Sequence, residues 1–433
     1  MDKREEGMGN DRLPQANTPQ DGECVPQANT PQDGECLLQP VERRNTACLK
    51  WDALETRFGD PDLIAMWVAD MDFAAPRPVI DALHARVEQG AFGYQMQALG
   101  WKDAFIQWER ERHGWLVDPE WIKYVPGVVP AIYWLIHAYT APGDACLIQT
   151  PVYYPFSYAV RDTGRRLVES ELVAVDGVYG INMDALEKTI VDHAVKLFIL
   201  CSPHNPVGRV WSHGELEAVW GVCQRHGVVL VSDEIHHDIV TGCRKHVPTG
   251  LLAGAAPDFI MLTSASKTFN LASLENALLV IPEAETRKRY DAFARSFHPS
   301  GGNLLGYVAV EAAYRQGAAW LEALLAEIRA NEAHLRQLFA RELPEVIMSP
   351  LEGTYLLWMD LRALVSADEL ETFMNRECGV AVDFGFWFGA CGSGHIRVNL
   401  ATPRWRVEDV GRRMVAAGVR RRNGGWMKEG SVT

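Results

Sequence analysis

The chain has 433 residues, of which 48% are hydrophobic, and it carries a formal net charge of −14 at pH 7. This length suits one large two-lobed enzyme or two to three domains, and the acidic balance argues against a surface for nucleic acid or anionic membrane. We find no apolar run long enough to cross a bilayer, and no signal peptide in the charged N-terminus. The nine cysteines form no CxxC pair, which is typical of reduced thiols in a cytoplasmic protein.

The first forty residues differ in composition from the rest of the chain. The sequence PQANTPQDGEC occurs twice, at 14–24 and at 26–36, and is rich in Pro, Gln, Asn, Asp and Gly. Such a segment cannot bury enough apolar surface to offset the entropy lost on ordering, and two copies are too few for a solenoid. We therefore predict a disordered tail over residues 1–40 and a globular body from residue 41.

The body begins with a helical pattern and continues with alternating strand and helix patterns. Pro78–Glu88 carries Val79, Ile80, Leu83 and Val87 on one face of a predicted helix and ends before Gly90. Short apolar runs that predict buried strands follow at Ala145–Gln149, Val195–Cys201, Val228–Ser232, Phe259–Ser264 and Ala277–Ile281. Amphipathic stretches such as His213–Arg225 lie between them, and Ala318–Leu343 predicts a long helix that leads into a second lobe. This alternation predicts an α/β fold with a largely parallel sheet covered by helices on both faces.

Three of the predicted strands are followed by polar residues that suit one kind of cofactor. Asn205 follows the run that ends at Cys201, Asp233 follows the run that ends at Ser232, and Lys267 comes just after the next run. Because ligands gather at the carboxyl ends of strands in open α/β sheets, we expect these three side chains to meet at one edge. An amine, an acidic partner for a ring nitrogen and a polar group for a ring hydroxyl are what a pyridoxal phosphate site requires.

Eight sequence blocks resemble those of a known family, in the same order, over about residues 43 to 410. They are KWD at 50, MWVADMDFAAP at 66, FGYQ at 92, TPVYYPF at 150, SPHNPVGRVW at 202, SDEIHHD at 232, SASKTFNLASL at 264 and HIRVNLATPR at 395. In these blocks the chain is similar to the fold-type I pyridoxal-phosphate enzymes, and within them to the cystathionine β-lyase-like C–S lyases of the MalY/PatB group. The resemblance implies a large domain with a mostly parallel sheet between helices, here residues 93–329. It also implies a smaller α+β domain, here residues 41–92 and 330–433.

The resemblance implies roles for the three residues at the strand ends. Lys267 would bind the cofactor aldehyde covalently and transfer the substrate proton, which suits a lysine whose pKa is lowered by burial and nearby positive charge. The alternative interpretation of Lys267 is a surface lysine in a loop. Asp233 would pair with the pyridine nitrogen, although an aspartate at this place also fits a helix N-cap. Asn205 would donate to the ring hydroxyl oxygen, and its alternative role is that of a turn residue before Pro206.

Further contacts to the ring and to the substrate are implied in the same way. Tyr153 would stack on the ring face of the cofactor, and Tyr154 is the alternative candidate for this role. His236 lies where the C–S lyase group commonly has a histidine. Arg397 would clamp the substrate α-carboxylate, because a guanidinium matches a carboxylate through two parallel hydrogen bonds. Arg404 is the fallback for this role.

The phosphate group of the cofactor needs donors at the start of a helix. An apolar helix pattern follows Gly127, and the backbone N–H groups of Val128 and Val129 would hold the phosphate there. Ser264 and Ser266 would add hydroxyl groups. Tyr94 resembles the tyrosine that reaches the phosphate of the neighbouring subunit, which implies a homodimer.

Two features depart from the family pattern or suggest another kind of site. Glu275 stands where related enzymes often carry a cation or a polar group near the phosphate, and its carboxylate would repel the phosphate unless it turns away. The sequence HHD at 236–238 could suggest a metal site, but no second ligand cluster follows from the sequence. We therefore expect no metal ion.

The resemblance favours a pyridoxal phosphate-dependent C–S β-lyase that cleaves L-cystathionine or a related S-substituted cysteine to a thiol, pyruvate and ammonia. An aminotransferase would use the same residues, and spacing does not separate the two reactions. A cofactor-binding regulatory protein is the alternative of another class. The effector domain of a DNA-binding regulator is disfavoured, since the tail has no helix-turn-helix pattern. We expect a small amino-acid substrate, no nucleic-acid or membrane partner, and a cytoplasmic homodimer.

Overall fold

The computed structural model describes residues 37–94, 96, 99–297 and 301–424. Nearly all of the predicted tail lies outside these residues, so that its disorder stays a prediction. The helices are α1 (Leu49–Asp52), α2 (Leu54–Phe58), α3 (Arg77–Glu88), α4 (Leu99–Trp108), α5 (Val128–Tyr139), α6 (Pro155–Asp162), α7 (Met183–His193), α8 (His213–His226), α9 (Thr249–Ala253), α10 (Ala265–Phe269), α11 (Ala284–Phe297), α12 (Leu304–Gln316), α13 (Ala318–Glu342), α14 (Leu370–Thr372) and α15 (Arg404–Arg422). Among the described helices, none is long and apolar enough to span a membrane.

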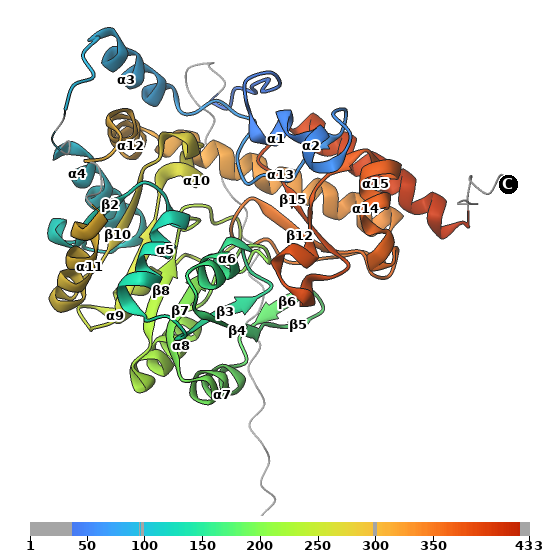
Figure 1. The fold of residues 1–433 in the computed structure, drawn as a ribbon. Coiled ribbons are helices and arrows are strands. Elements are labelled where there is room, and N and C mark those ends of the chain that lie inside the picture. Colours follow the sequence, from blue (N-terminus) through green and yellow to red (C-terminus); the bar gives the residue numbers. More distant parts are fainter. Residues whose placement is uncertain (1–36, 95, 97–98, 298–300, 425–433) are drawn as a thin grey trace, which may run out of the picture. The chain divides into compact units, whose positions relative to one another are not determined.

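A seven-stranded sheet lies at the centre of the fold, in the order β2-β10-β9-β8-β7-β3-β4 (Figure 1). Its strands are β2 (Ile122–Val125), β3 (Ala145–Thr150), β4 (Arg166–Glu171), β7 (Val195–Cys201), β8 (Val229–Asp233), β9 (Phe259–Thr263) and β10 (Ala277–Val280). The neighbouring strands β4, β3, β7, β8 and β9 run parallel to one another, while β10 is antiparallel to both β9 and β2. The predicted, largely parallel sheet is confirmed, and each predicted strand end lies within one residue of the observed end.

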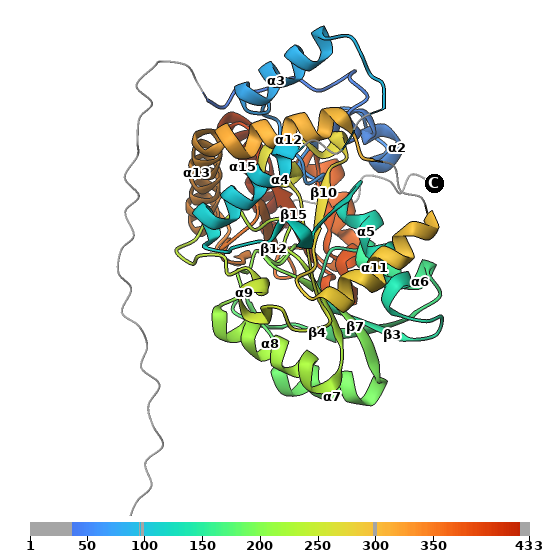
Figure 2. The same ribbon diagram turned by 90° about the vertical axis from the view of Figure 1, so that its left-hand side faces the viewer.

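Alternate side chains of these strands pack against helices on opposite faces of the sheet. Leu197 and Ile199 of β7 belong to a core cluster that includes α5, α6 and part of α11. Their neighbours Phe198 and Leu200 belong to a second cluster that includes α7, α8 and α13. Figure 2 shows the sheet with α5, α6 and α11 on one side and α8 and α9 on the other. The continuous apolar runs in the sequence therefore reflect strands that are buried on both faces.

A second, smaller sheet is formed by the C-terminal part of the chain. Its four antiparallel strands lie in the order β11 (Ile347–Met348), β12 (Leu356–Asp360), β15 (His395–Asn399) and β14 (Asp383–Phe384). The short strand β1 (Ile64–Ala65) pairs with β13 (Val380–Ala381), so that the segment before α3 joins this part of the fold. A hairpin of β5 (Val173–Val175) and β6 (Val178–Gly180) completes the strands.

The ends of α8 follow the local sequence rules, whereas the apolar face predicted for α3 is only partly buried. Helix α8 begins with a capping box between Ser212 and Glu215 and ends at Gly227 in a left-handed conformation. In α3 the apolar pattern placed Val79 and Val87 on one face, but only Val79 is buried, and Val87 is 52% exposed. Helix α3 packs against α12. The domain boundaries that we derived from the resemblance stay a prediction.

Candidate functional site

The carboxyl ends of β7, β8 and β9 meet at one cavity of about 220 Å³. The cavity is lined by Ala69, Gly127, Val128, Val129, Pro130, Tyr153, Cys201, Asn205, Asp233, Ile235, His236, Ser266, Lys267 and Ala272. Asn205, Asp233 and Lys267 are therefore brought together, as the strand-end rule predicts. The cavity walls also include the start of α5, which comes from a part of the chain before all three strands.

Lys267 occupies the middle of the short helix α10, directly after β9. The side chain is half-buried and borders the cavity, and its Nζ donates a hydrogen bond to the carbonyl oxygen of Ala69 at 2.7 Å. Burial lowers the pKa of Lys267 to about 8; the carboxylate of Asp70 opposes this shift and the positive charge of Arg397 adds to it. An amine with this pKa is partly neutral near physiological pH and can act as a nucleophile or a base.

Asp233 is the last residue of β8, and its carboxylate is buried at the cavity wall. One of its oxygens, Oδ1, accepts a hydrogen bond from the backbone N–H of Ile235 at 3.1 Å. Turns follow the strand instead of a helix, so that this bond closes a turn and is not a helix N-cap. Burial raises the pKa of Asp233 to about 7, although the Ile235 N–H and the charge of Lys267 oppose this shift. A cation placed beside Asp233 would keep it ionised.

Asn205 connects the cavity to a buried arginine on the smaller sheet. The Arg397 guanidinium donates through Nη1 to Oδ1 of Asn205 at 2.8 Å and through Nη2 to the carbonyl oxygen of Trp67 at 3.0 Å. Because Oδ1 of Asn205 already accepts from Arg397, the Nδ2 group of this amide remains as its donor. Separate sequence motifs point to Asn205 and to Arg397, but neither motif predicts the contact between them.

Arg397 also forms an ion pair with Asp383, a residue that the sequence analysis did not select. The two residues face each other across the antiparallel pair β14 and β15, and both are buried. Burial raises the pKa of Asp383 to about 6, against the positive charges of Arg397 and Arg57. Only the strand register reveals this pair, since 383 and 397 belong to strands whose pairing a sequence does not state. Arg404, the alternative carboxylate ligand, instead bonds to Glu408 and to the Ala330 carbonyl oxygen.

Two aromatic side chains at the cavity wall come from the predicted set. Tyr153 lines the cavity, whereas Tyr154 does not and packs with its ring centroid 5.7 Å from that of Phe388. His236 is buried beside the ring of Tyr355, with 5.9 Å between the centroids. Burial and the nearby charges of Lys267 and Arg397 hold the pKa of His236 well below its usual value. The imidazole of His236 is therefore neutral.

The start of α5 supplies the part of the wall that suits an anion. Gly127 precedes the helix in an extended conformation, and Val128 and Val129 form its first turn at the cavity. The first N–H groups of a helix have no partner within it and carry a partial positive charge. Ser266 also lines the cavity. Ser264 does not line it: its hydroxyl donates to the Asn276 carbonyl oxygen at 2.7 Å and accepts from the Ser266 N–H, which caps α10.

Two further predicted residues lie away from this cavity. Tyr94 is fully exposed and does not line the cavity of its own chain. Glu275 is exposed and is not part of the lining, and its backbone carbonyl oxygen accepts a hydrogen bond from the Tyr124 hydroxyl. The Glu275 side chain is therefore not part of the cavity wall.

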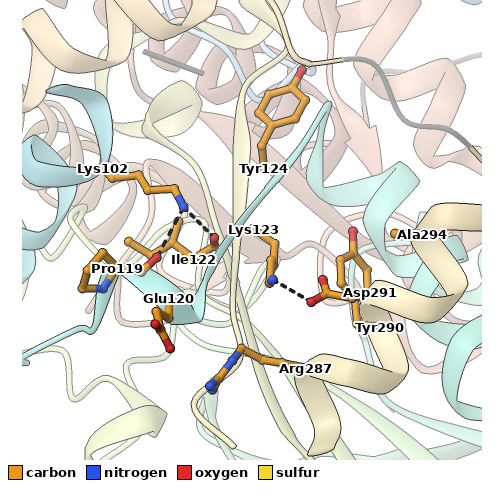
Figure 3. Close-up of a pocket in the computed structure, with 10 residues that line it drawn as sticks. All are labelled: Lys102, Pro119, Glu120, Ile122, Lys123, Tyr124, Arg287, Tyr290, Asp291 and Ala294. Carbon is orange, nitrogen blue, oxygen red and sulfur yellow. Dashed lines mark hydrogen bonds and ion pairs between the residues drawn. The ribbon is translucent and has the colours of Figure 1, made fainter. Parts of the chain in front are cut away.

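A larger hollow, of about 680 Å³, lies between β2 and α11 (Figure 3). Its basic side chains are engaged in local contacts. Lys102 donates to the carbonyl oxygens of Pro119 and Ile122, and Lys123 pairs with Asp291 at 2.9 Å. It lacks the combination of amine, carboxylate and helix start that the smaller cavity provides. We therefore place the functional site at the carboxyl ends of the parallel strands.

Comparison with known proteins gives a consistent result for most of the chain. Residues 68–410 match the family described as aminotransferase class I and II. Cystathionine beta-lyase PatB of Bacillus subtilis (strain 168) is 39% identical over 378 residues, which cover 87% of this chain and 98% of the relative. Protein MalY of Escherichia coli (strain K12) is 34% identical over 375 residues, which cover 85% of this chain and 95% of the relative.

The solved structures lead to the same group of proteins. The PLP-bound C–S lyase from Staphylococcus hominis superposes with a TM-score of 0.83 and 30% sequence identity, over 88% of this chain and 97% of that chain. PLP denotes pyridoxal 5′-phosphate. Because both the fold and the sequence match over nearly the whole length of these proteins, the predicted fold-type I architecture is confirmed.

Proposed function

Because the chain belongs to the aminotransferase class I and II family, we propose that it is a pyridoxal phosphate-dependent carbon–sulfur β-lyase. Its substrate is L-cystathionine or a related S-substituted cysteine, and its products are a thiol, pyruvate and ammonia. The observation that carries this proposal is the 39% identity to a cystathionine β-lyase over 98% of that protein's length. The cavity between Lys267, Asp233 and the start of α5 agrees with it.

The residues around the cavity fit pyridoxal phosphate. A buried carboxylate with a pKa raised to about 7, that of Asp233, suits a protonated ring nitrogen as its partner. The free N–H groups at Val128 and Val129 suit a phosphate dianion, with the Ser266 hydroxyl beside them. The amine of Lys267, which lines the same cavity, suits an aldehyde. When bound, the cofactor supplies a ring that withdraws electrons from the substrate Cα.

Each side chain then has a defined task. Lys267 would hold the cofactor and take the proton from the substrate Cα, because its lowered pKa makes the neutral amine available near pH 8. Asp233 would keep the ring nitrogen protonated. Asn205 would donate from Nδ2 to the ring hydroxyl oxygen, since its Oδ1 accepts from Arg397. Tyr153 would cover the ring face, and the neutral His236 would add to the wall without a charge.

Arg397 binds the α-carboxylate of the amino acid and thereby orients its Cα–H bond. The two terminal nitrogens of Arg397 contact Asn205, Asp383 and the Trp67 carbonyl oxygen, and these contacts fix the guanidinium plane. A fixed guanidinium loses little entropy when it binds a carboxylate through two hydrogen bonds. The same arrangement excludes substrates without an α-carboxylate.

After the Cα proton has been removed, the substituent on Cβ determines whether elimination or amino transfer follows. When Cβ carries a thioether sulfur, the Cβ–S bond breaks and the thiolate leaves with the bonding electron pair. The thiolate takes up a proton, and the three-carbon remainder takes up water to give pyruvate and ammonia. Without a leaving group on Cβ, the same residues would support amino transfer instead. Expulsion of the thiolate is unimolecular, whereas amino transfer needs a second proton transfer and a second substrate.

The assembly and the location of the enzyme form part of the same proposal. Tyr94 is fully exposed, and Phe92 and Met96 beside it are 60% and 84% exposed, which favours burial of this segment against a second copy of the chain. We therefore propose a homodimer in which Tyr94 reaches the phosphate of the partner's cofactor. Buried thiols at Cys146, Cys201 and Cys223 suit a reducing cytoplasm.

The test is a steady-state assay of the purified holoenzyme with L-cystathionine and no added keto acid. Pyruvate and homocysteine should appear in equal amounts over many turnovers. L-Alanine, which lacks a leaving group, should release at most one pyruvate per active site, the product of a single amino transfer. Amino transfer from ordinary amino acids without any pyruvate from thioethers would make the chain an aminotransferase. Cofactor binding without turnover of any amino acid would make it a regulatory protein.

A further inference from the structure

A buried cluster of titratable side chains lies outside the cavity, behind the loop that follows β8. In this loop His236 faces the cavity, whereas His237 and Asp238 turn to the opposite side and meet a π-helical turn, Glu109–His113, that follows α4. Glu109, His113 and His237 each bring one ligand atom within 4.8 Å of the others. The sequence HHD had suggested a metal site without a second ligand cluster; the fold supplies that cluster from the earlier segment.

Polar atoms in this cluster lack the hydrogen bonds that burial demands. Glu109 and His237 are fully buried, and Oε1 of Glu109 lies 3.1 Å from Nε2 of His237. Neither oxygen of Glu109 nor Nε2 of His237 makes a hydrogen bond to any of the residues that the structure describes. A carboxylate and an imidazole nitrogen that are close but not aligned can both bind a third atom beside them. Orphaned buried groups of this kind are explained by an ion or a water that they bind.

The second His237 nitrogen prepares the first for coordination. Nδ1 of His237 lies 2.6 Å from the Glu234 carbonyl oxygen, to which it donates, and 2.8 Å from the Thr263 hydroxyl. A histidine held through one nitrogen by a backbone carbonyl is the usual arrangement of a metal ligand. This donation leaves Nε2, which faces the Glu109 carboxylate, as the atom that would coordinate a metal ion.

Asp238 orients His113 in the same way that the Glu234 carbonyl oxygen orients His237. Its Oδ1 lies 2.9 Å from Nε2 of His113 and accepts from the Trp108 indole, and its Oδ2 accepts from the Thr268 hydroxyl at 2.8 Å. The Oδ2 atom lies 3.5 Å from Nε2 of His237. Ligand atoms around a tetrahedral zinc ion with bonds of about 2.0 Å are separated by about 3.3 Å, close to the 3.1 Å between Oε1 of Glu109 and Nε2 of His237.

We propose that Glu109, His113 and His237 bind a divalent transition-metal ion of the zinc class. Two imidazoles and one carboxylate are a ligand set that zinc prefers, and Asp238 orients His113 from behind. The His113 side chain is 5% exposed, so that the bound ion would be almost fully enclosed by protein. The bound ion ties the π-helical turn to the loop after β8. Through Asp238 and Thr268 it stiffens the helix that carries Lys267.

The experiment measures zinc bound by the purified holoenzyme. The wild type and the variants His237→Asn and Glu109→Gln are incubated with excess ZnCl₂, desalted and analysed for zinc by atomic emission. His226→Asn is the matched control, since His226 lies 2.8 Å from a carboxylate of Glu187 on the surface. We expect about one zinc per chain in the wild type and in the control, and at least a roughly tenfold lower content in the two cluster variants.

Cobalt(II) provides a second readout that needs no variant. Cobalt bound by nitrogen and oxygen ligands in a tetrahedral site absorbs visible light strongly, and zinc should remove this absorbance by displacement. A wild-type protein that retains no zinc and gives no cobalt spectrum would overturn the proposal. Equal zinc retention in the wild type and in folded His237→Asn protein would overturn it as well, because the metal would then lie elsewhere.

Discussion

Asp233 and Lys267 carry charges that the protein buries at a cost. Burial brings the pKa of Asp233 up to about 7 and the pKa of Lys267 down to about 8, so that each loses part of its charge near neutral pH. Buried ionisable groups with such perturbed pKa values gather at functional sites, where a ligand supplies the missing partner. The cofactor-free protein should therefore gain stability when one of these groups is made neutral.

Asp233→Asn should stabilise the cofactor-free protein at pH 8. The folded-state pKa of Asp233 lies above the unfolded value of 3.8, so the native state binds more protons between about pH 4 and pH 7. Wild-type stability should consequently fall as pH rises through this window, while the variant has no such dependence. Because a tenfold change in proton affinity corresponds to about 1.4 kcal/mol, the variant should be more stable by at least about 1 kcal/mol at pH 8. Thermal unfolding at pH 8 and pH 5 measures the difference, and a gap that does not narrow at pH 5 would contradict the assignment.

Arg397→Lys should lower kcat/KM for L-cystathionine roughly 10- to 100-fold, about the loss of one hydrogen bond to a charged group. Lysine keeps the charge but cannot reproduce the contacts to Asn205, Asp383 and Trp67 while also binding a carboxylate through two bonds. Arg404→Lys is the control and should change kcat/KM by no more than about twofold, because Arg404 bonds to Glu408 and to the Ala330 carbonyl oxygen away from the cavity. A larger effect at Arg404 than at Arg397 would reverse the two assignments.

At the scale of elements, the sequence predicted β3, β7, β8, β9 and β10 of the main sheet because these strands are buried on both faces. It did not predict the edge strands β2 and β4, which are only partly buried. Runs such as Val195–Cys201 have no long polar interruption. Their positions predicted that Asn205, Asp233 and Lys267 would meet where the strands end. The sequence pattern could not predict contacts between distant elements. Glu109 and His237 belong to segments far apart in the sequence, and the residues around each give no indication of the contact with the other. Ser264 has no local feature that separates a helix cap from a phosphate ligand.

The tight packing of α9 leads to a prediction in which helix propensity and sterics oppose each other. Alanine is favoured over glycine in a helix by up to about 1 kcal/mol. At Gly250 an added methyl group would overlap the indole ring of Trp115, so Gly250→Ala should destabilise the protein. At Gly221 in α8 the nearest atom is the mobile end of Arg225 at 3.5 Å, so Gly221→Ala should be neutral or stabilising. Urea unfolding of the two variants decides, and equal effects would contradict the packing of α9.

At the scale of the whole molecule, the resemblance to a known family predicted more than the pattern of apolar residues did. The eight blocks span the body from residue 43 to 410, and the family match covers residues 68–410. The repeated tail lies outside both, and composition alone supports its predicted disorder. The proposed homodimer rests on the exposure of Tyr94, which does not line its own chain's cavity.

Mixing two inactive variants tests whether sites are shared between subunits. Lys267→Ala removes the amine of a chain's own site, and Tyr94→Ala removes the proposed contact to the partner's site. In a mixed dimer one site regains both residues, so unfolding and refolding an equal mixture should restore roughly a quarter of wild-type activity. Each variant refolded by itself is the control. Activity in the mixture that equals the mean of the two controls would show that Tyr94 acts within its own chain or not at all.

The proposed mechanism assigns the proton transfer of a C–S β-lyase to Lys267, and a single variant is enough to test it. Pyruvate release from L-cystathionine by Lys267→Ala should fall at least about 10²- to 10⁴-fold, the contribution of a positioned base, because the covalent tether is lost as well. Far-UV circular dichroism and thermal unfolding should show that the variant keeps its fold. A folded Lys267→Ala protein that releases pyruvate at a near-normal rate would contradict this role of Lys267.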